Sequence, residues 1–409
     1  MTLRRLLVVT HETTLTGAPM NLLHFVNWLS ANTDIELHTL VLKDGPLRHR
    51  FEWVSDVTVL DESAMNSLLA AMQQGLVHLG SRRAWRPIAA LRLSPQLRKL
   101  RDFDLAYFNS VTSIGVLPYL PPTPVVVNHV HELQVALKSW QPSHDYDLFR
   151  TLPHQWIAAS QAVSNMLIDD LDLPAERVSL HHEFIDARAV ADNVVALRES
   201  ERCRREFRIP ADAAIVMGAG TIDWRKGPDL FIQLAMEVRR RSREPVHFVW
   251  VGGDLTGLDM HRLRSDIDRS GADHVHFVGV KPDPMAWFAM ADVFALTSRE
   301  DPFPLVCLEH AALGHPIVTY RNGGIVELLD GAGPAAATGI VEHLDVGAMA
   351  HRVLNFLQSD RLRLAAGREL KDRVLAEHDV SSAAPRLLAT LESLTSTVGT
   401  DPRLIGTIR

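Results

Sequence analysis

Short apolar segments rich in β-branched residues alternate with amphipathic segments along the whole chain. Near-continuous apolar runs are typical of strands buried on both faces of a parallel sheet, and helical stretches between them indicate βαβ units. The runs predict strands at residues 6–10, 35–42, 57–60, 105–109, 124–129, 156–159, 178–180, 214–218, 246–251, 275–280, 293–297 and 316–319. The pattern therefore predicts an α/β fold with doubly wound parallel sheets.

The alternation of strands and helices is interrupted between about residues 185 and 210, where the chain is polar and carries mixed charge. We expect a boundary there between an N-terminal domain (residues 1–195) and a second domain (residues 210–380). The chain has 409 residues, which agrees with two domains. Leu and Ala recur at helical spacing near the end of the chain, and residues 381–409 are expected to form a helix that packs back on the first domain.

The composition excludes several classes of protein. A formal charge of −7 and 22% charged residues disfavour general nucleic-acid binding and disorder. Only Cys203 and Cys307 are present, without metal-binding spacing, which favours a reducing compartment. The apolar run at Leu6–Val9 is shorter than the apolar core of a secretory signal, and no segment reaches the ~18 apolar residues of a membrane span. We expect a cytoplasmic protein.

One segment is unusual in charge, because residues 64–101 contain no Asp or Glu. Its second part, residues 82–101, combines Arg and Lys with Trp85 and aliphatic residues. A basic amphipathic stretch of this kind can dock on anionic lipid headgroups, which predicts peripheral membrane association. It is equally typical of a solvated helix face or of a basic wall for an anionic acceptor, so these alternatives stay open.

A strand–loop–helix unit near residue 220 carries two adjacent cations. Gly218 and Gly220 begin like a dinucleotide fingerprint, but Asp223 stands where the third glycine is required, which argues against NAD binding. Arg225 and Lys226 directly precede a predicted helix, whose free N–H groups favour anions. The unit fits a diphosphate, and the alternative is a pair of solvated loop cations.

A second unit follows the predicted strand at residues 293–297. Asp301 precedes a helix, and the amides of residues 303–306 are the unpaired donors of its first turn. Glu309 lies about two turns further and can accept hydrogen bonds from a diol. Two carboxylates around an anion site suit a phosphate flanked by two sugars, whereas the alternative is a helix cap and a surface glutamate.

The segment Asp301–Glu309, followed by Gly314-His315-Pro316, resembles the E-x7-E signature of retaining family-four glycosyltransferases of the GT-B fold, the group 1 enzymes that include glycogen-synthase-like and mannosyltransferase-like members. Asp301 and Pro304 depart from that pattern, which usually has Glu and a small residue there. Other segments resemble the family in order and spacing, namely Gly17-Ala18-Pro19, His131-Glu132, 156–160, Arg225-Lys226-Gly227, 275–279, 323–327 and 338–339.

The resemblance implies two facing doubly wound Rossmann-like domains with mostly parallel sheets and a C-terminal helical segment. It also implies transfer of a sugar, with retention, from a UDP- or GDP-linked donor to an acceptor hydroxyl. The residues that it implies for catalysis are His131, Asp301, Lys226 and Arg225. Those that it implies for binding the nucleotide sugar are Gly17, Gly220, Lys281, Phe303, Leu305, Val306 and Glu309.

The expected partners are the nucleotide sugar and a glycan, lipid-linked or small natural-product acceptor, without nucleic acid. No cofactor or catalytic metal is expected, because the three Asp-x-Asp triplets at 102–104, 170–172 and 266–268 are read as chance occurrences in an acidic chain. Two alternatives remain on the same fold. One is a non-catalytic nucleotide-sugar or glycan binder, and the other is a sugar-nucleotide epimerase or a phosphorylase.

Overall fold

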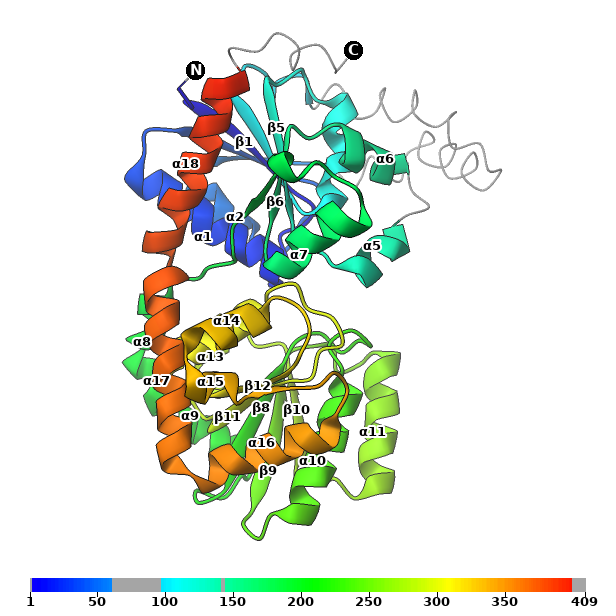
Figure 1. Ribbon diagram of the computed structural model, residues 1–409, viewed down its shortest axis with the longest axis vertical. Helices are drawn as coiled ribbons and strands as arrows, with labels where there is room; N and C mark the ends of the chain where they lie inside the picture. Colours follow the sequence, from blue (N-terminus) through cyan, green and yellow to red (C-terminus); the bar gives the residue numbers. More distant parts are fainter. Residues whose placement is uncertain (1, 61–96, 141–143, 399–409) are drawn as a thin grey trace, which may run out of the picture. The chain divides into compact units, whose positions relative to one another are not determined.

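The computed structural model describes residues 2–60, 97–140 and 144–398. The chain divides into two compact units, residues 1–181 with 383–409, and residues 182–382. In each unit, helices cover a parallel β-sheet (Figure 1). Among the described helices, none combines the length and the apolar character needed to span a membrane.

The sheet of the first unit has seven strands in the order β3-β2-β1-β4-β5-β6-β7, and every neighbouring pair is parallel. The strands are β1 (Arg5–Thr10), β2 (Glu36–Val41), β3 (Asp56–Val59), β4 (Leu105–Asn109), β5 (Val125–Val130), β6 (Gln155–Ala158) and β7 (Val178–Leu180). All residues of β4 and β5 are buried, as expected for strands covered on both faces.

Short helical elements surround this first sheet. They are α1 (Gly17–Asn32), α2 (Arg48–Glu52), η2 (Val111–Tyr119), α5 (Gln134–Trp140), α6 (His144–Thr151), α7 (Gln161–Asn165), η3 (Met166–Asp170) and η4 (Ala175–Arg177). On one face, Phe25 of α1 packs with its ring 6.1 Å from that of Tyr107. On the other, Phe108, Phe149 and Trp156 join one apolar cluster.

The sheet of the second unit has six parallel strands in the order β10-β9-β8-β11-β12-β13. The strands are β8 (Ala214–Ala219), β9 (Val246–Val251), β10 (Val275–Gly279), β11 (Val293–Leu296), β12 (Ile317–Tyr320) and β13 (Ile340–Val341). Successive residues of β8 enter different cores: Ile215 and Met217 join one cluster, and Val216 joins the other. This alternation shows that helices cover both faces of the sheet.

The helices of the second unit divide between these two clusters. They are α8 (Ala187–Ala191), α9 (Val194–Glu206), α10 (Pro228–Arg241), α11 (Leu258–Ser270), α12 (Met285–Phe288), α13 (Leu305–Leu313), α14 (Ile325–Ala332), α15 (Pro334–Ala337), α16 (Val346–Gln358) and α17 (Asp360–Glu377). Leu230 and Leu234 of α10 lie in the same cluster as Met349 of α16, whereas Cys307 and Leu308 of α13 lie in the other.

Every strand predicted from the sequence is a strand in the structure, so the α/β fold with doubly wound parallel sheets is confirmed. The division into units differs from the expected one, because it lies between residues 181 and 182. The polar stretch around residues 185–206 belongs to the second unit: Ile185, Ala187 and Cys203 are buried in its core. The last helix, α18 (Val380–Val398), is grouped with the first unit from Ala383 onward.

Candidate active site

The loops after β8 and β11 are neighbours, because these two strands pair in the sheet. In open parallel sheets, ligands bind at the carboxyl ends of the strands. The first loop ends at Gly227, in the left-handed conformation, where α10 starts with Pro228. The second loop ends at Pro304, after which α13 starts with Leu305. Two helix N-termini therefore begin at this edge of the sheet.

An ion pair joins the two loops. Lys226 Nζ lies 2.5 Å from Asp301 Oδ2, and the hydroxyl of Ser298 donates to the same oxygen at 3.1 Å. Arg225 Nη1 lies 3.9 Å from Asp301 Oδ1 and donates to the carbonyl of Glu300 at 3.2 Å. Asp301 is only 3% exposed. The structure thus brings together Arg225, Lys226 and Asp301, which the family resemblance assigned to catalysis.

Glycines allow close packing around Asp301 and Lys226, one from the loop after β12 and one from the loop after β8. A Cβ on Gly323, whose φ is +63°, would lie 1.9 Å from the carbonyl oxygen of Asp301. A Cβ on Gly220, whose φ is +145°, would lie 3.1 Å from the aliphatic carbons of Lys226. Because Gly220 has no side chain, the lysine stem packs directly along the backbone of the loop.

The first turn of α13 lies next to Asp301 in the chain. Phe303 is buried, and Leu305 and Val306 are the first two residues of the helix, so their amides have no acceptor within it. Pro304 has no amide hydrogen, so its replacement of the family's small residue removes one donor from this turn. The remaining amides and the helix dipole still favour an anion here.

Glu309 lies one turn further along α13 and is partly buried. Burial raises the pKa of its carboxyl group to about 8. Among the described residues, none forms a hydrogen bond or an ion pair with this carboxyl group. A partly buried carboxyl group without a protein partner can accept hydrogen bonds from ligand hydroxyls, which would lower its pKa again.

The remaining predicted residue of the second unit, Lys281, lies elsewhere. It follows β10, and its ammonium sits over the ring of Trp287, 4.4 Å from the ring centroid. Cation–π contact gives this lysine a defined position in the loop after β10. The structure does not place it in the cluster of Lys226 and Asp301.

In the first unit, His131 follows β5 at the carboxyl edge of the sheet. Its Nε2 lies 2.8 Å from Asn109 Oδ1, and its backbone amide donates to Glu132 Oε2 at 2.9 Å. The Glu132 carboxylate also accepts from the hydroxyl of Ser110. His129, two residues earlier, is fully buried, and its Nδ1 is hydrogen-bonded to the hydroxyl of Tyr107. Burial lowers the pKa of His129 well below the usual value. Of the two histidines, His131 is the accessible one.

Two further residues, Gly17 and His11, follow β1 at the same edge of the sheet. Gly17, predicted to contact the substrate, is the first residue of α1. His11, which sequence reasoning missed, directly follows β1 and is close enough to Glu132, Glu12 and His131 for their charges to act on it. Desolvation lowers the pKa of His11, although the two carboxylates oppose this effect. Its position after β1, on the edge that also carries His131, is the signal that could have found it.

Two further contacts were missed in the second unit. Glu327, in the Gly-Gly-x-x-Glu segment, is hydrogen-bonded to His182, whose Nε2 lies 2.7 Å from Glu327 Oε2. Arg299 donates to both oxygens of Asp229, at 2.9 and 2.6 Å. Burial disfavours the charged Asp229, but the hydrogen bonds and charge of Arg299 outweigh this and lower its pKa.

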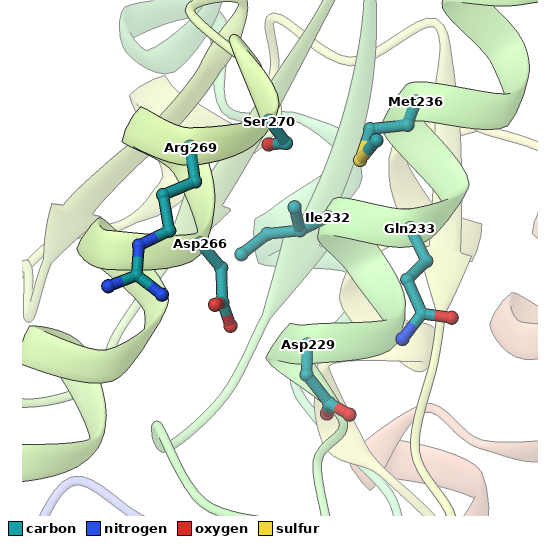
Figure 2. Close-up of a pocket in the computed structure, with 7 residues that line it drawn as sticks. All are labelled: Asp229, Ile232, Gln233, Met236, Asp266, Arg269 and Ser270. Carbon is teal, nitrogen blue, oxygen red and sulfur yellow. The ribbon is translucent and has the colours of Figure 1, made fainter.

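A surface pocket of about 370 Å³ lies between α10 and α11. Figure 2 shows the side chains of Asp229, Asp266 and Arg269 around it. None of the predicted site residues lines this pocket. Asp229 is the connection to the loops above, since it lines the pocket and also binds Arg299. The pocket is therefore not the predicted nucleotide site.

A parallel α/β domain with cations and a helix N-terminus at the carboxyl edge of its sheet has the arrangement of proteins that bind phosphorylated ligands. Residues 199–373 match the family described as "Glycosyl transferases group 1". This segment is therefore similar to the group 1 glycosyltransferases, which agrees with the resemblance found in the sequence.

Curated relatives align over parts of the chain. D-inositol 3-phosphate glycosyltransferase of Arthrobacter sp. (strain FB24) is 35% identical over 127 residues, which are 30% of this chain and 30% of the relative. O-antigen biosynthesis glycosyltransferase WclY of Escherichia coli is 27% identical over 254 residues, or 58% of this chain and 68% of the relative. The alignments with the first two relatives span only about a third of their length.

Solved structures match nearly the whole chain at low identity. Anabaena Alr3699/HepE, solved in complex with UDP and glucose, has a TM-score of 0.77 and 18% identity, covering 95% of this chain and 99% of that one. WaaG, a glycosyltransferase involved in lipopolysaccharide biosynthesis, has a TM-score of 0.70 and 12% identity, with the same coverage. These likenesses concern the fold, and they confirm the GT-B fold class with its two Rossmann-like domains.

Proposed function

We propose that this protein is a retaining glycosyltransferase, which transfers a sugar from a nucleoside-diphosphate sugar to an acceptor hydroxyl without a catalytic metal. The observation that carries the proposal is the pair Lys226–Asp301 beside the first turn of α13. A cation, free amides and two carboxylates on one edge match the charges and hydroxyls of such a donor. The family match at residues 199–373 supports the same reaction class.

The donor would bind through its two kinds of polar group. Lys226, assisted by Arg225 and by the amides of Leu305 and Val306, would hold the diphosphate. Glu309 would accept hydrogen bonds from the ribose hydroxyls, and Asp301 from the sugar. A sugar linked to UDP or GDP is proposed as the donor. The UDP-containing structures of Anabaena Alr3699/HepE favour UDP.

Catalysis would depend on stabilising the leaving diphosphate. As the bond to the anomeric carbon breaks, negative charge grows on the leaving phosphate oxygen, where Lys226 and the helix dipole act most strongly. That oxygen would then take the proton of the acceptor hydroxyl on the same face of the sugar, so the anomeric configuration is retained. His131, with its ring fixed by Asn109, would orient a substrate hydroxyl.

For the acceptor, only a chemical class is proposed. The names of relatives point to inositol phosphate, lipopolysaccharide core and O-antigen, so a glycan or lipid-linked hydroxyl is proposed here. The predicted membrane contact lies in the stretch 82–101, of which residues 82–96 are outside the described residues, and it stays a prediction. The cytoplasmic location is likewise a prediction from the sequence.

A panel of nucleoside diphosphates and their sugars tests the proposal. Ligands that bind the folded state raise the melting temperature, so thermal unfolding should identify the preferred base. The matching nucleotide sugar should then be hydrolysed slowly without acceptor and release free nucleotide. Tight nucleotide binding without turnover of any sugar nucleotide would favour the non-catalytic binder, whereas an altered, still nucleotide-linked sugar would favour an epimerase.

A further inference from the structure

An exposed indole stands in the loop that carries Arg225 and Lys226. Trp224 is 59% exposed, and among the large apolar side chains exposed in the described part of the second unit it is the only aromatic one. Trp250 and Trp287 of the same unit are 1% and 5% exposed. Isolated exposed apolar residues are common, so exposure alone gives Trp224 no role.

The support beneath the indole distinguishes it from an ordinary surface residue. The guanidinium carbon of Arg299 lies 5.2 Å from the centroid of the Trp224 ring. Arg299 Nη1 also donates to the carbonyl of Trp224 at 2.8 Å, and its backbone amide donates to the carbonyl of Arg225 at 2.7 Å. One arginine therefore holds both the ring and the backbone of this tryptophan.

Arg299 is itself fixed. Its side chain is 14% exposed, and both terminal nitrogens bind the carboxylate of Asp229 at the start of α10. A planar arginine held by a bidentate carboxylate has little freedom to move. Stacked on such a group, the indole is held in a defined orientation although its outer face is open to solvent. By contrast Trp53, which is 77% exposed in the first unit, rests edge-on against His49.

We propose that Trp224 is a carbohydrate platform, on whose exposed face a pyranose ring of a bound substrate stacks. The inference rests on the proposed function, because Trp224 directly precedes the two cations assigned to the diphosphate. Pyranoses present a face of C–H bonds that packs on an indole, with hydroxyl groups around the rim. The next residue, Arg225, has a side chain that is 33% exposed, and its guanidinium offers N–H donors for those hydroxyls.

A pyranose ring can come from the donor or from the acceptor. In the donor it is attached to the diphosphate, so stacking would strengthen binding of a nucleotide sugar over that of the nucleotide alone. In the acceptor it is independent of the nucleotide, so a simple glycoside would reach the indole by itself. The two sources therefore differ in which probe reports contact with Trp224.

The test uses the full-length protein labelled with 5-fluorotryptophan. The fluorine signal of Trp224 is identified because it is missing from Trp224→Phe, and that of Trp53 because it is missing from Trp53→Ala, which also serves as the exposed-tryptophan control. One arm titrates UDP-glucose and GDP-mannose against UDP and GDP. The other titrates methyl α- and β-pyranosides of glucose, galactose and mannose, and calorimetry measures the affinities of Trp224→Ala and Trp224→Phe.

We expect the Trp224 signal to move with a nucleotide sugar or with a pyranoside, while the Trp53 signal stays fixed. Trp224→Ala should then bind that probe about tenfold more weakly, whereas Trp224→Phe, which keeps a ring, should lose less. A Trp224 signal that no sugar moves, in a protein that binds nucleotide, overturns the platform, and so does wild-type affinity in Trp224→Ala. Failure of the proposed function looks different, because the wild-type protein would then bind and turn over no sugar nucleotide at all.

Discussion

The ammonium of Lys226 lies 2.5 Å from a carboxylate oxygen of Asp301, a residue 75 positions later in the chain. The pair joins the loop after β8 to the loop after β11. Lys226 is thus paired with an anion of the protein itself, and a bound diphosphate would share or replace that partner. Asp301, held by Lys226 and Ser298, is fixed in position for any ligand that approaches the same edge.

Replacing Asp301 by asparagine should show whether a bound diphosphate takes the place of this carboxylate as the partner of Lys226. Asp301→Asn leaves Lys226, whose side chain is 15% exposed, without its ion-pair partner, so the free energy of unfolding should fall by about 1–3 kcal/mol. Added nucleoside diphosphate should restore a larger share of the melting temperature than in the wild type, because the phosphate supplies the missing anion. Ser298→Ala is the control, since it removes one hydrogen bond, worth about 1 kcal/mol, and keeps the ion pair. Equal ligand-induced shifts in all three proteins would contradict competition for Lys226.

Removing the lysine should mainly affect turnover. Lys226→Ala deletes a cation that faces charge growing on the leaving diphosphate, and a loss of about 2–4 kcal/mol of transition-state stabilisation is expected. Steady-state kinetics with the preferred sugar nucleotide measure this loss. Arg225 Nη1 lies 3.9 Å from Asp301 Oδ1, so this carboxylate keeps a nearby cation and the loss of stability is limited. Thermal unfolding checks that the variant is folded. Lys43→Ala, at an exposed lysine of the first unit, is the matched control, and near-wild-type turnover in Lys226→Ala would defeat the assignment.

Most strands were predictable because they are nearly continuous apolar runs, whereas β13 was missed since it has only two residues, Ile340 and Val341. The cations and carboxylates were found as separate motifs along the chain. Their ion pair was not predictable, because it depends on β8 pairing with β11, strands that are not consecutive in sequence. His11 was missed for the same reason, since its neighbours include Asn109 at the end of β4 and His131 after β5.

A pair of glycines tests the close approach of the loop after β12, which carries Gly323, to Asp301 in the loop after β11. Gly323 and Gly271 have nearly the same φ, +63° and +65°, but a Cβ at Gly323 would meet the carbonyl of Asp301, whereas nothing lies within 4 Å at Gly271. Gly271→Ala should therefore cost only the left-handed strain, about 1–2 kcal/mol. Gly323→Ala should cost clearly more in denaturant unfolding and also weaken nucleotide binding, because Asp301 must move. Equal costs in the two variants would show that the loops are free to separate.

Glu309 should make stability depend on pH. Its folded-state pKa of about 8 lies above the ordinary value of 4.5, so between these values the folded protein binds a proton that the unfolded chain has lost. Stability from this group is therefore present at low pH and declines as the pH rises from about 4.5 to 8. Glu309→Gln cannot titrate, so its unfolding free energy should fall less steeply over that range and exceed the wild-type value at pH 8–9.

Nucleotide binding gives the same residue a second readout. Ribose hydroxyls donating to Glu309 would favour its charged form, so nucleotide should stabilise the wild type more at pH 8 than at pH 6. Glu309→Gln should lose that difference and bind nucleotide more weakly at pH 8. The two readouts are independent, because a buried carboxyl group without a ligand role would change the unfolding curve alone. Parallel unfolding curves together with an unchanged nucleotide dissociation constant would remove Glu309 from the ribose site.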